Sequence, residues 1–313
     1  MENNETEIET NHEKHHSEKK SKKMSRTTII AIVVAIILII AGGLTWLYTG
    51  NVSSAKEKVF KVLPLPAAIV NTKFVSAKEA LARVELAKQL AESQGMGAVI
   101  DPTQTYDQLL ESKKITVLVS RERLSVKNEE IDEEYKNIVK QYAAGDEAKF
   151  KEELEKTYRM SPEKFKNEVI RQELEQSQLA IWYSKQEGFN KDAYAKAKEL
   201  QGKLDGGQSF DEVATAYTQD EATKDFAGDS GLVVFNDLLP EFRTELAEVK
   251  VGDIKLVPSR YGLHILKVLE LNNDGPDGAK QIHLQQIFVK QTGFEEWLKN
   301  ETAAVKIYKL LKF

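Results

Sequence analysis

The chain has 313 residues, which is enough for about two domains of ordinary size. Its apolar share of 41% and charged share of 30% are those of a globular protein, and its net charge of -5 argues against a nucleic-acid-binding protein, which usually has a basic surface. The sequence contains no cysteine, which excludes disulfides, thiol chemistry and cysteine-based zinc sites.

The first 26 residues mix acidic and basic side chains and contain almost no large apolar group, so we expect a disordered cytoplasmic tail at 1–26. His12, His15 and His16 in this tail are of a residue type that binds metals. A solvated polar tract is the simpler interpretation. We therefore predict no metal site and no cofactor.

Residues 27–48 form an almost entirely apolar segment, and no charged residue occurs between Arg26 and Lys56. A helix of this length reaches ~33 Å, enough to cross a hydrocarbon layer of ~30 Å. Basic residues precede the segment, while Trp46 and Tyr48 end it, a pattern that predicts a cytoplasmic N-terminus. We expect a single-pass anchor in the lipid bilayer, with the rest of the chain outside the cytoplasm. The alternative is a cleaved signal peptide, whose apolar core is usually shorter.

Start signals for helices predict an all-helical domain at 60–187. Ser76-Ala-Lys-Glu79 is a capping box, and Ser161-Pro-Glu163 places a Ser cap before a Pro at the first helical position. Residues 63–71, with two prolines, suit a strand or a packed linker, and residues 107–124 are ambiguous between strand and helix.

After Gly188 the pattern changes to a mixture of helices and short strands. Ser209 and Glu212 form another capping box, and a loop rich in Gly and Asp follows. Residues 262–269 and 281–290 are strand candidates. The mixture predicts an α+β fold.

Six short blocks between Lys191 and Leu269 resemble the parvulin, or PpiC-type, family of peptidyl-prolyl isomerases, with the family's spacing between them. The blocks are Ser209-Phe-Asp-Glu-Val-Ala, Tyr217-Thr-Gln-Asp220, Gly228-Asp-Ser-Gly231, Leu239-Pro-Glu-Phe242, Val251-Gly-Asp-Ile254 and Tyr261-Gly-Leu-His-Ile-Leu-Lys-Val268. The resemblance implies a parvulin-like domain at 190–292, a small antiparallel sheet with helices. It also implies cis/trans isomerisation of X-Pro peptide bonds without a cofactor.

One strand of the family is missing from its usual place. Parvulin domains open with a central strand of the form His-Ile-Leu-Val-Lys, but residues 185–190 contain nothing similar. Gln286-Ile-Phe-Val-Lys290 instead follows the last strand. We infer a circularly permuted domain whose C-terminal strand fills the central position, next to residues 262–269. The alternative is an unrelated strand at 281–290.

The resemblance also assigns a substrate pocket. Leu238 and Phe242 hold the proline-pocket positions, for which plain core packing is the alternative without the family match. Ser230 stands where the family usually has a pocket Leu. The resemblance therefore implies a shallower or wetter pocket.

The polar residues of the site follow from the same resemblance. Asp220 matches the acidic residue that faces the amide, His264 the strand histidine, and Ser259 the hydroxyl that supports it. Gln286 replaces the second histidine, and an amide cannot titrate. His283 lies three residues earlier, so strand alternation places it on the opposite face of the sheet from Gln286. We expect activity to be reduced but not lost.

The helical region resembles the N-terminal chaperone domain of SurA-like and PrsA-like foldases, through residues 66–74 and 124–132. Together the two resemblances imply a membrane-anchored extracytoplasmic foldase that acts on unfolded or newly exported polypeptides. The alternative is a non-catalytic tethered chaperone that uses a parvulin-shaped module to bind clients, which Gln286 and Ser230 favour. The apolar residues within 293–313 predict a packing helix followed by a terminal strand.

Overall fold

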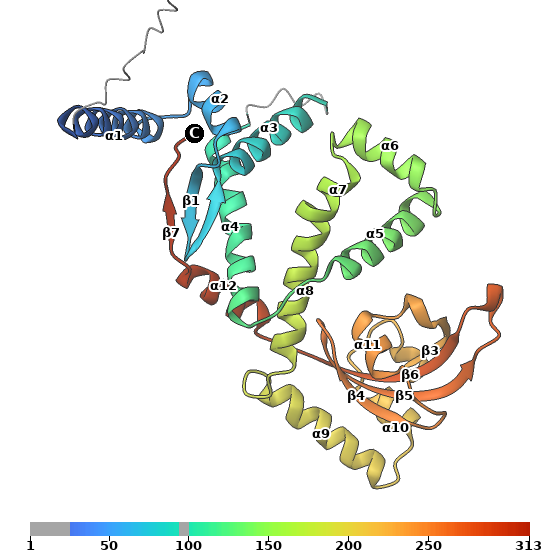
Figure 1. The fold of residues 1–313 in the computed structure, drawn as a ribbon. Helices are drawn as coiled ribbons and strands as arrows, with labels where there is room; N and C mark the ends of the chain where they lie inside the picture. Colours follow the sequence, from blue (N-terminus) through green and yellow to red (C-terminus); the bar gives the residue numbers. More distant parts are fainter. Residues whose placement is uncertain (1–25, 94–99) are drawn as a thin grey trace, which may run out of the picture. The chain divides into compact units, whose positions relative to one another are not determined.

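The computed structural model describes residues 26–93 and 100–313 and divides the chain into two compact units, residues 1–50 and residues 51–313 (Figure 1). The predicted tail at 1–26 lies outside the described residues, apart from Arg26.

The described part of the first unit is one helix, α1 (Arg26–Tyr48), which coincides with the predicted anchor at 27–48. Within the described residues, no helix has both the length and the apolar character needed to cross a membrane. The predicted transmembrane anchor is therefore not supported.

The second unit begins with a series of helices, and the predicted helix start at Ser161 is present. Ser161 accepts a backbone N–H of its helix and is followed by a proline at the first helical position. Asp101, which was not predicted as a helix start, caps α4 in the same way. The ambiguous stretch at 107–124 belongs mainly to a helix, α4. The helices are α2 (Ser54–Val62), α3 (Ala77–Ser93), α4 (Pro102–Arg121), α5 (Asn128–Ala143), α6 (Glu147–Thr157), α7 (Pro162–Phe165) and α8 (Arg171–Ser184), with a π-helical turn, η1 (Lys166–Ile170), before α8.

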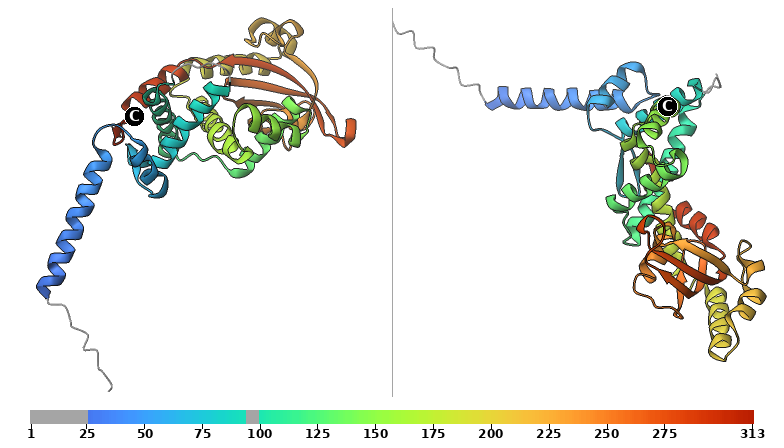
Figure 2. Two further views of the ribbon diagram at one scale, coloured as in Figure 1. Left: turned by 90° about the horizontal axis from the view of Figure 1, so that it is seen from above. Right: turned by 90° about the vertical axis from the view of Figure 1, so that its right-hand side faces the viewer.

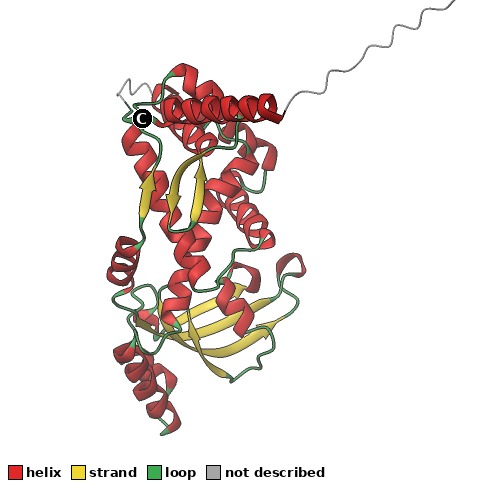
Figure 3. Cartoon of the chain, turned by 60° about the vertical axis from the view of Figure 1, so that its left-hand side comes forward, coloured by secondary structure: helices red, strands yellow, loops and turns green. Residues whose placement is uncertain are grey.

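The prediction of an all-helical domain is wrong, because three short strands form a sheet beside these helices (Figure 3). β1 (Pro66–Val70) pairs antiparallel with β2 (Lys73–Ser76) on one side and with β7 (Ile307–Lys309) on the other. Local patterns indicated a strand or linker at 63–71. They could not reveal its partner β7, which comes from the opposite end of the chain.

The C-terminal segment forms the predicted packing helix, α12 (Phe294–Ala304), and the predicted strand β7. On α12, Phe294 and Leu298 are buried in a cluster with Leu118 of α4 and with Leu179 and Tyr183 of α8. The last residues of the chain therefore complete the core of the first helices.

Between α8 and α12 the chain forms a four-stranded antiparallel sheet of strand order β3-β6-β5-β4, whose strands lie side by side in both views of Figure 2. Helices α9 and α10 pack on one face, and α11 packs against β4 on the other side of the core. The elements are α9 (Lys191–Asp205), α10 (Phe210–Tyr217), η2 (Lys224–Phe226), β3 (Asp229–Val234), η3 (Phe235–Asp237), α11 (Pro240–Glu245), β4 (Ile254–Pro258), β5 (Gly262–Asn272), η4 (Pro276–Gly278) and β6 (Gln281–Lys290).

The alternation of side chains along β5 and β6 separates two cores. Leu263 and Ile265 of β5, with Ile287 of β6, pack under α9 and α10. Leu266 and Leu284 belong to the cluster of α11. His264 and Gln286 share that second face, because they stand an even number of residues from Leu266 and Leu284. The predicted antiparallel pairing of 262–269 with 281–290 is present, and it brings the candidate polar residues together.

Candidate active site

The four polar residues predicted for the site form one chain of hydrogen bonds. Ser259 Oγ lies 2.8 Å from His264 Nε2, and His264 Nδ1 lies 3.1 Å from Gln286 Oε1. Gln286 Nε2 donates to Asp220 Oδ2 at 2.6 Å. The side chains come from the turn before β5, from β5, from β6 and from the loop after α10. A glutamine thus links the histidine to the carboxylate.

Asp220 is held against β6 by the loop that follows α10. The backbone N–H of Gln219 donates to Phe288 O at 2.9 Å, and Thr218 Oγ1 accepts the N–H of Phe288 at 3.1 Å. Thr223 Oγ1 donates to Asp220 Oδ2 at 2.5 Å. Thr223 is not among the residues predicted for the site. Its signal in the sequence is its position three residues after a turn Asp, where a hydroxyl can bond back.

Ser259 is placed by a tight turn between β4 and β5. Its backbone N–H donates to Gly262 O at 2.8 Å, and its Oγ accepts the N–H of Tyr261 at 3.0 Å. Gly262 has a φ of 153°, and a Cβ there would lie 2.3 Å from Val289 O. Only glycine fits at this position, so the close approach of the turn to β6 depends on it.

His264 is buried, with 6% of its surface exposed, between two aromatic rings. Its imidazole stacks on Phe288 at a centroid distance of 4.6 Å and meets the edge of Phe242 at 4.8 Å. Burial lowers its pKa from 6.5 to about 4, although the hydrogen bond with Gln286 and the charge of Asp220 act in the opposite direction. His264 is therefore neutral at physiological pH.

The predicted pocket residues differ in their surroundings. Phe242 is buried on α11, and its cluster includes the half-buried Leu238. Ser230 is exposed on β3 and donates to Leu284 O at 2.8 Å. Phe242 and Leu238 therefore lie together, whereas Ser230 is engaged with the backbone of β6.

The second histidine of the sheet is separate from this chain. His283 Nε2 lies 2.6 Å from Asp229 Oδ1, which pairs it with β3. Gln285 lies on the same face of β6 as His283, and its side-chain amide donates to Asp211 Oδ1 at 2.6 Å. Among the residues whose side chains are described, no group of three or more metal-ligating side chains occurs. The arrangement can bind and orient a polar group, and it has no activated nucleophile.

Comparison with known proteins gives a match to the PPIC-type PPIase domain over residues 156–272. The foldase protein PrsA 2 of Bacillus cereus is 34% identical over 167 residues, which are 49% of this chain and 56% of that protein. The chaperone SurA of Nitrosospira multiformis is 32% identical over 113 residues, which are 34% of this chain and 26% of that protein. Residues 156–272 therefore resemble a PPIC-type PPIase domain, and parts of the chain are similar to PrsA and SurA.

The relatives are matched over part of their length only, less than two thirds of either protein. A crystal structure of PrsA from Bacillus anthracis is also similar, at 22% identity and a TM-score of 0.21, covering 63% of this chain and 86% of that chain. The family match ends at residue 272, before β6. The parvulin match therefore includes Asp220, Ser259 and His264 but not Gln286.

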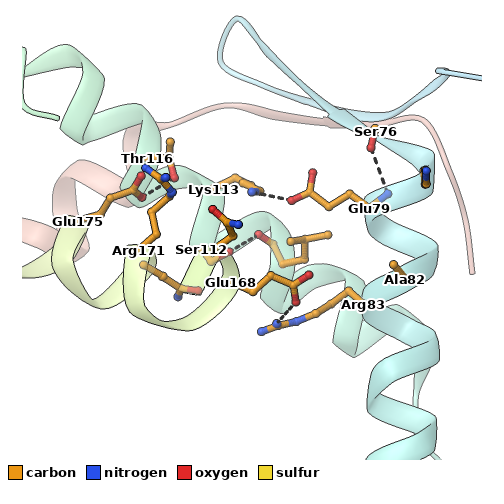
Figure 4. Close-up of a pocket in the computed structure, with 14 residues that line it drawn as sticks. Ser76, Glu79, Ala82, Arg83, Ser112, Lys113, Thr116, Glu168, Arg171 and Glu175 are labelled. Carbon is orange, nitrogen blue, oxygen red and sulfur yellow. Dashed lines mark hydrogen bonds and ion pairs between the residues drawn. The ribbon is translucent and has the colours of Figure 1, made fainter. Parts of the chain in front are cut away.

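A second feature is a cavity of about 490 Å³ among α3, α4 and α8, whose lining on α8 falls within the residues of the family match (Figure 4). Ion pairs cross it, from Lys113 to Glu79 at 2.7 Å and from Arg83 to Glu168 at 3.5 Å. Glu175, with 8% exposed, accepts from the hydroxyl of Thr116 at 2.7 Å. The cavity lies in the helical region that resembles a chaperone domain, and it is lined by both charges and apolar stems.

Proposed function

We propose that the parvulin domain catalyses cis/trans isomerisation of X-Pro peptide bonds in unfolded, newly exported polypeptides. The observation that carries this proposal is the hydrogen-bond chain that ends at Asp220 and whose His264 contacts the buried ring of Phe242. An apolar surface can bind a proline ring, and polar groups aligned next to it can contact the amide of that proline.

The chemistry requires the twisted amide to be favoured over the planar one. Rotation about the peptide bond has a barrier of ~18–20 kcal/mol, because twisting removes the conjugation between nitrogen and carbonyl. Conjugation places negative charge on the carbonyl oxygen. A fixed carboxylate beside that oxygen repels the planar state more than the twisted state, which lowers the barrier. Asp220 has this role in the proposal, and Phe242 with Leu238 receives the pyrrolidine ring.

The test is isomerisation of a short X-Pro peptide by the full chain and by its Asp220→Asn variant. We expect the variant to lose at least about tenfold in kcat/KM, which corresponds to ~1.4 kcal/mol of transition-state stabilisation. Asp211→Asn is the matched control, because Asp211 also accepts from a glutamine of β6 but on the opposite face of the sheet. An equal loss in both variants, or no activity of the folded wild type above background, would exclude this function.

A second candidate function is that of a chaperone that binds clients without catalysis. Gln286 in place of a histidine, the exposed Ser230 and the cavity between α3, α4 and α8 favour it. The measurement is suppression of the aggregation of an unfolded client. We expect Asp220→Asn to suppress aggregation as the wild type does, whether or not isomerisation is lost. If the substitution removed both activities together, a separate holding function would be contradicted.

We further propose that residues 190–292 are a circularly permuted parvulin domain. The family match ends before β6, yet β6 lies between β3 and β5 and supplies Gln286. Residues 60–187 then form the client-holding domain, and residues 293–313 complete it through α12 and β7. This domain organisation explains why the missing family strand is found at the end of the sequence.

A further inference from the structure

The direction of the hydrogen-bond chain is set at its carboxylate end. An ionised carboxylate only accepts, so the Gln286 group that lies 2.6 Å from Asp220 Oδ2 must be the amide N–H. The reversed amide would bring two acceptor oxygens together at that distance. Thr223 donates to the same Oδ2, whereas Oδ1 has only a 3.4 Å contact with the N–H of Ala222. Oδ1 is therefore the oxygen left for a substrate.

Each following group is fixed in turn. With its N–H on Asp220, Gln286 presents its carbonyl oxygen to His264, so His264 Nδ1 must carry the proton. A neutral imidazole then has an unprotonated Nε2, which accepts the only proton of the Ser259 hydroxyl. Ser259 Oγ in turn accepts the N–H of Tyr261. Each link of this hydrogen-bond chain then joins one donor to one acceptor.

From this geometry we infer that Gln286 is a positioning residue: it holds His264 as its Nδ1–H tautomer and keeps Asp220 as the single, fixed charge of the site. The consequence of this inference for catalysis rests on the proposed function. A histidine at position 286 would be able to take up a proton beside Asp220, since a neighbouring negative charge favours the charged form. The amide side chain of a glutamine cannot take up this proton. Position 286 therefore adds no titrating group to the site.

The charges around His264 are compatible with this neutrality. Burial holds its pKa at about 4, and of the described groups only Asp220 raises that pKa through its charge. The other charged or titratable groups on the elements packed against it are Glu241, Arg243 and Glu245 on α11, Lys255 on β4, Arg260 and Tyr261 on the turn, Lys267 and Glu270 on β5, and His283 and Lys290 on β6. No titration of His264 is expected between pH 5 and pH 8.

The direct test is nitrogen NMR of the full chain labelled at its histidines. The chain has five histidines, and only His264 and His283 lie beyond residue 16. The His283→Asn variant distinguishes these two signals. We expect His264 to show a protonated Nδ1 and an unprotonated Nε2, unchanged from pH 5 to pH 8. A proton on Nε2, or a titration near the ordinary pKa of ~6.5, would overturn the inference.

Substitutions on β6 separate positioning from general packing. Gln286→Leu removes the acceptor of His264 Nδ1–H, so the tautomers of His264 should become mixed. Gln286→His should introduce a titrating histidine with a pKa above ~6.5, owing to Asp220. Gln285→Leu is the control, since Gln285 lies next in sequence but on the opposite face. If Gln286→Leu does not fold, the histidine variant alone decides, and the absence of a new titration would contradict the inference.

Activity provides a readout that distinguishes this inference from the proposed function. The wild type should have a flat profile of kcat/KM from pH 5 to pH 8, and Gln286→His should show an inflection within that range. An inactive wild type with the expected His264 tautomer would reject the proposed function and leave the positioning role of Gln286 intact. An active wild type whose activity follows a titration near pH 6.5 would reject the positioning role alone.

Discussion

The buried neutral His264 should make the stability of the protein depend on pH in a defined direction. In the unfolded chain the pKa of this histidine is ~6.5. In the folded chain burial lowers it to about 4. The unfolded state therefore binds the proton more readily, and the stabilising contribution is complete above pH ~6.5 and is lost as the pH falls through 4. Between pH 7 and pH 4.5 the loss is about 2 to 3 kcal/mol.

Urea unfolding of the wild type and of His264→Asn at pH 7 and pH 4.5 measures this contribution. Carboxylates contribute equally to both proteins, so the difference between their pH dependences isolates His264. The free energy of unfolding of the wild type should fall by about 2 to 3 kcal/mol more than that of the variant. His283→Asn, which removes the half-buried partner of Asp229, should follow the wild type. Parallel pH dependences in the wild type and His264→Asn would refute the assignment of a buried neutral histidine.

Two further substitutions test the fold that supports the site. Gly228 has a φ of +79°, and a Cβ there would lie 2.0 Å from Gln286 O, so Gly228→Ala should reduce the free energy of unfolding by at least about 3 kcal/mol in urea unfolding. Gly207→Ala, with a φ of +92° but open space, should cost only about 1 to 2 kcal/mol, and equal losses would contradict the steric argument. Phe294→Ala should cost about 3 kcal/mol because Phe294 is buried in the core shared by α4, α8 and α12, and a thermal melt should show it. Phe226→Ala, at a side chain that is 70% exposed, is its control and should change little.

Local signals predicted the helices and the strands of the site well. The capping box of Ser209 and Glu212 is present with both of its hydrogen bonds, because such contacts depend on residues three apart. The antiparallel pairing of β5 with β6 also followed from the sequence, since a short linker joins them. The resemblance grouped His264 with Gln286, and strand alternation separated His283 from Gln286.

What the sequence could not show depends on residues far apart in the chain. The sheet of β1, β2 and β7 joins the two ends of residues 51–313, and no local pattern encodes that pairing. The apolar run at 27–48 predicted a membrane anchor that the described residues do not support. Within the site, Thr223 and the ring of Phe288 were missed. Both are identified only by what they contact, Asp220 and His264.

The replacement of a histidine by Gln286 has a simple energetic consequence. A buried polar chain is stable when each of its groups has a partner, and costly when one is left alone or charged. Here the amide of Gln286 hydrogen-bonds to both His264 and Asp220. The negative charge of Asp220 lies at the less buried end of this row of hydrogen bonds. Because β6 is paired on both edges, by β3 and β5, the backbone that carries Gln286 cannot shift without breaking the sheet. The glutamine therefore gives up a titrating group and in return holds the carboxylate of Asp220 in one place.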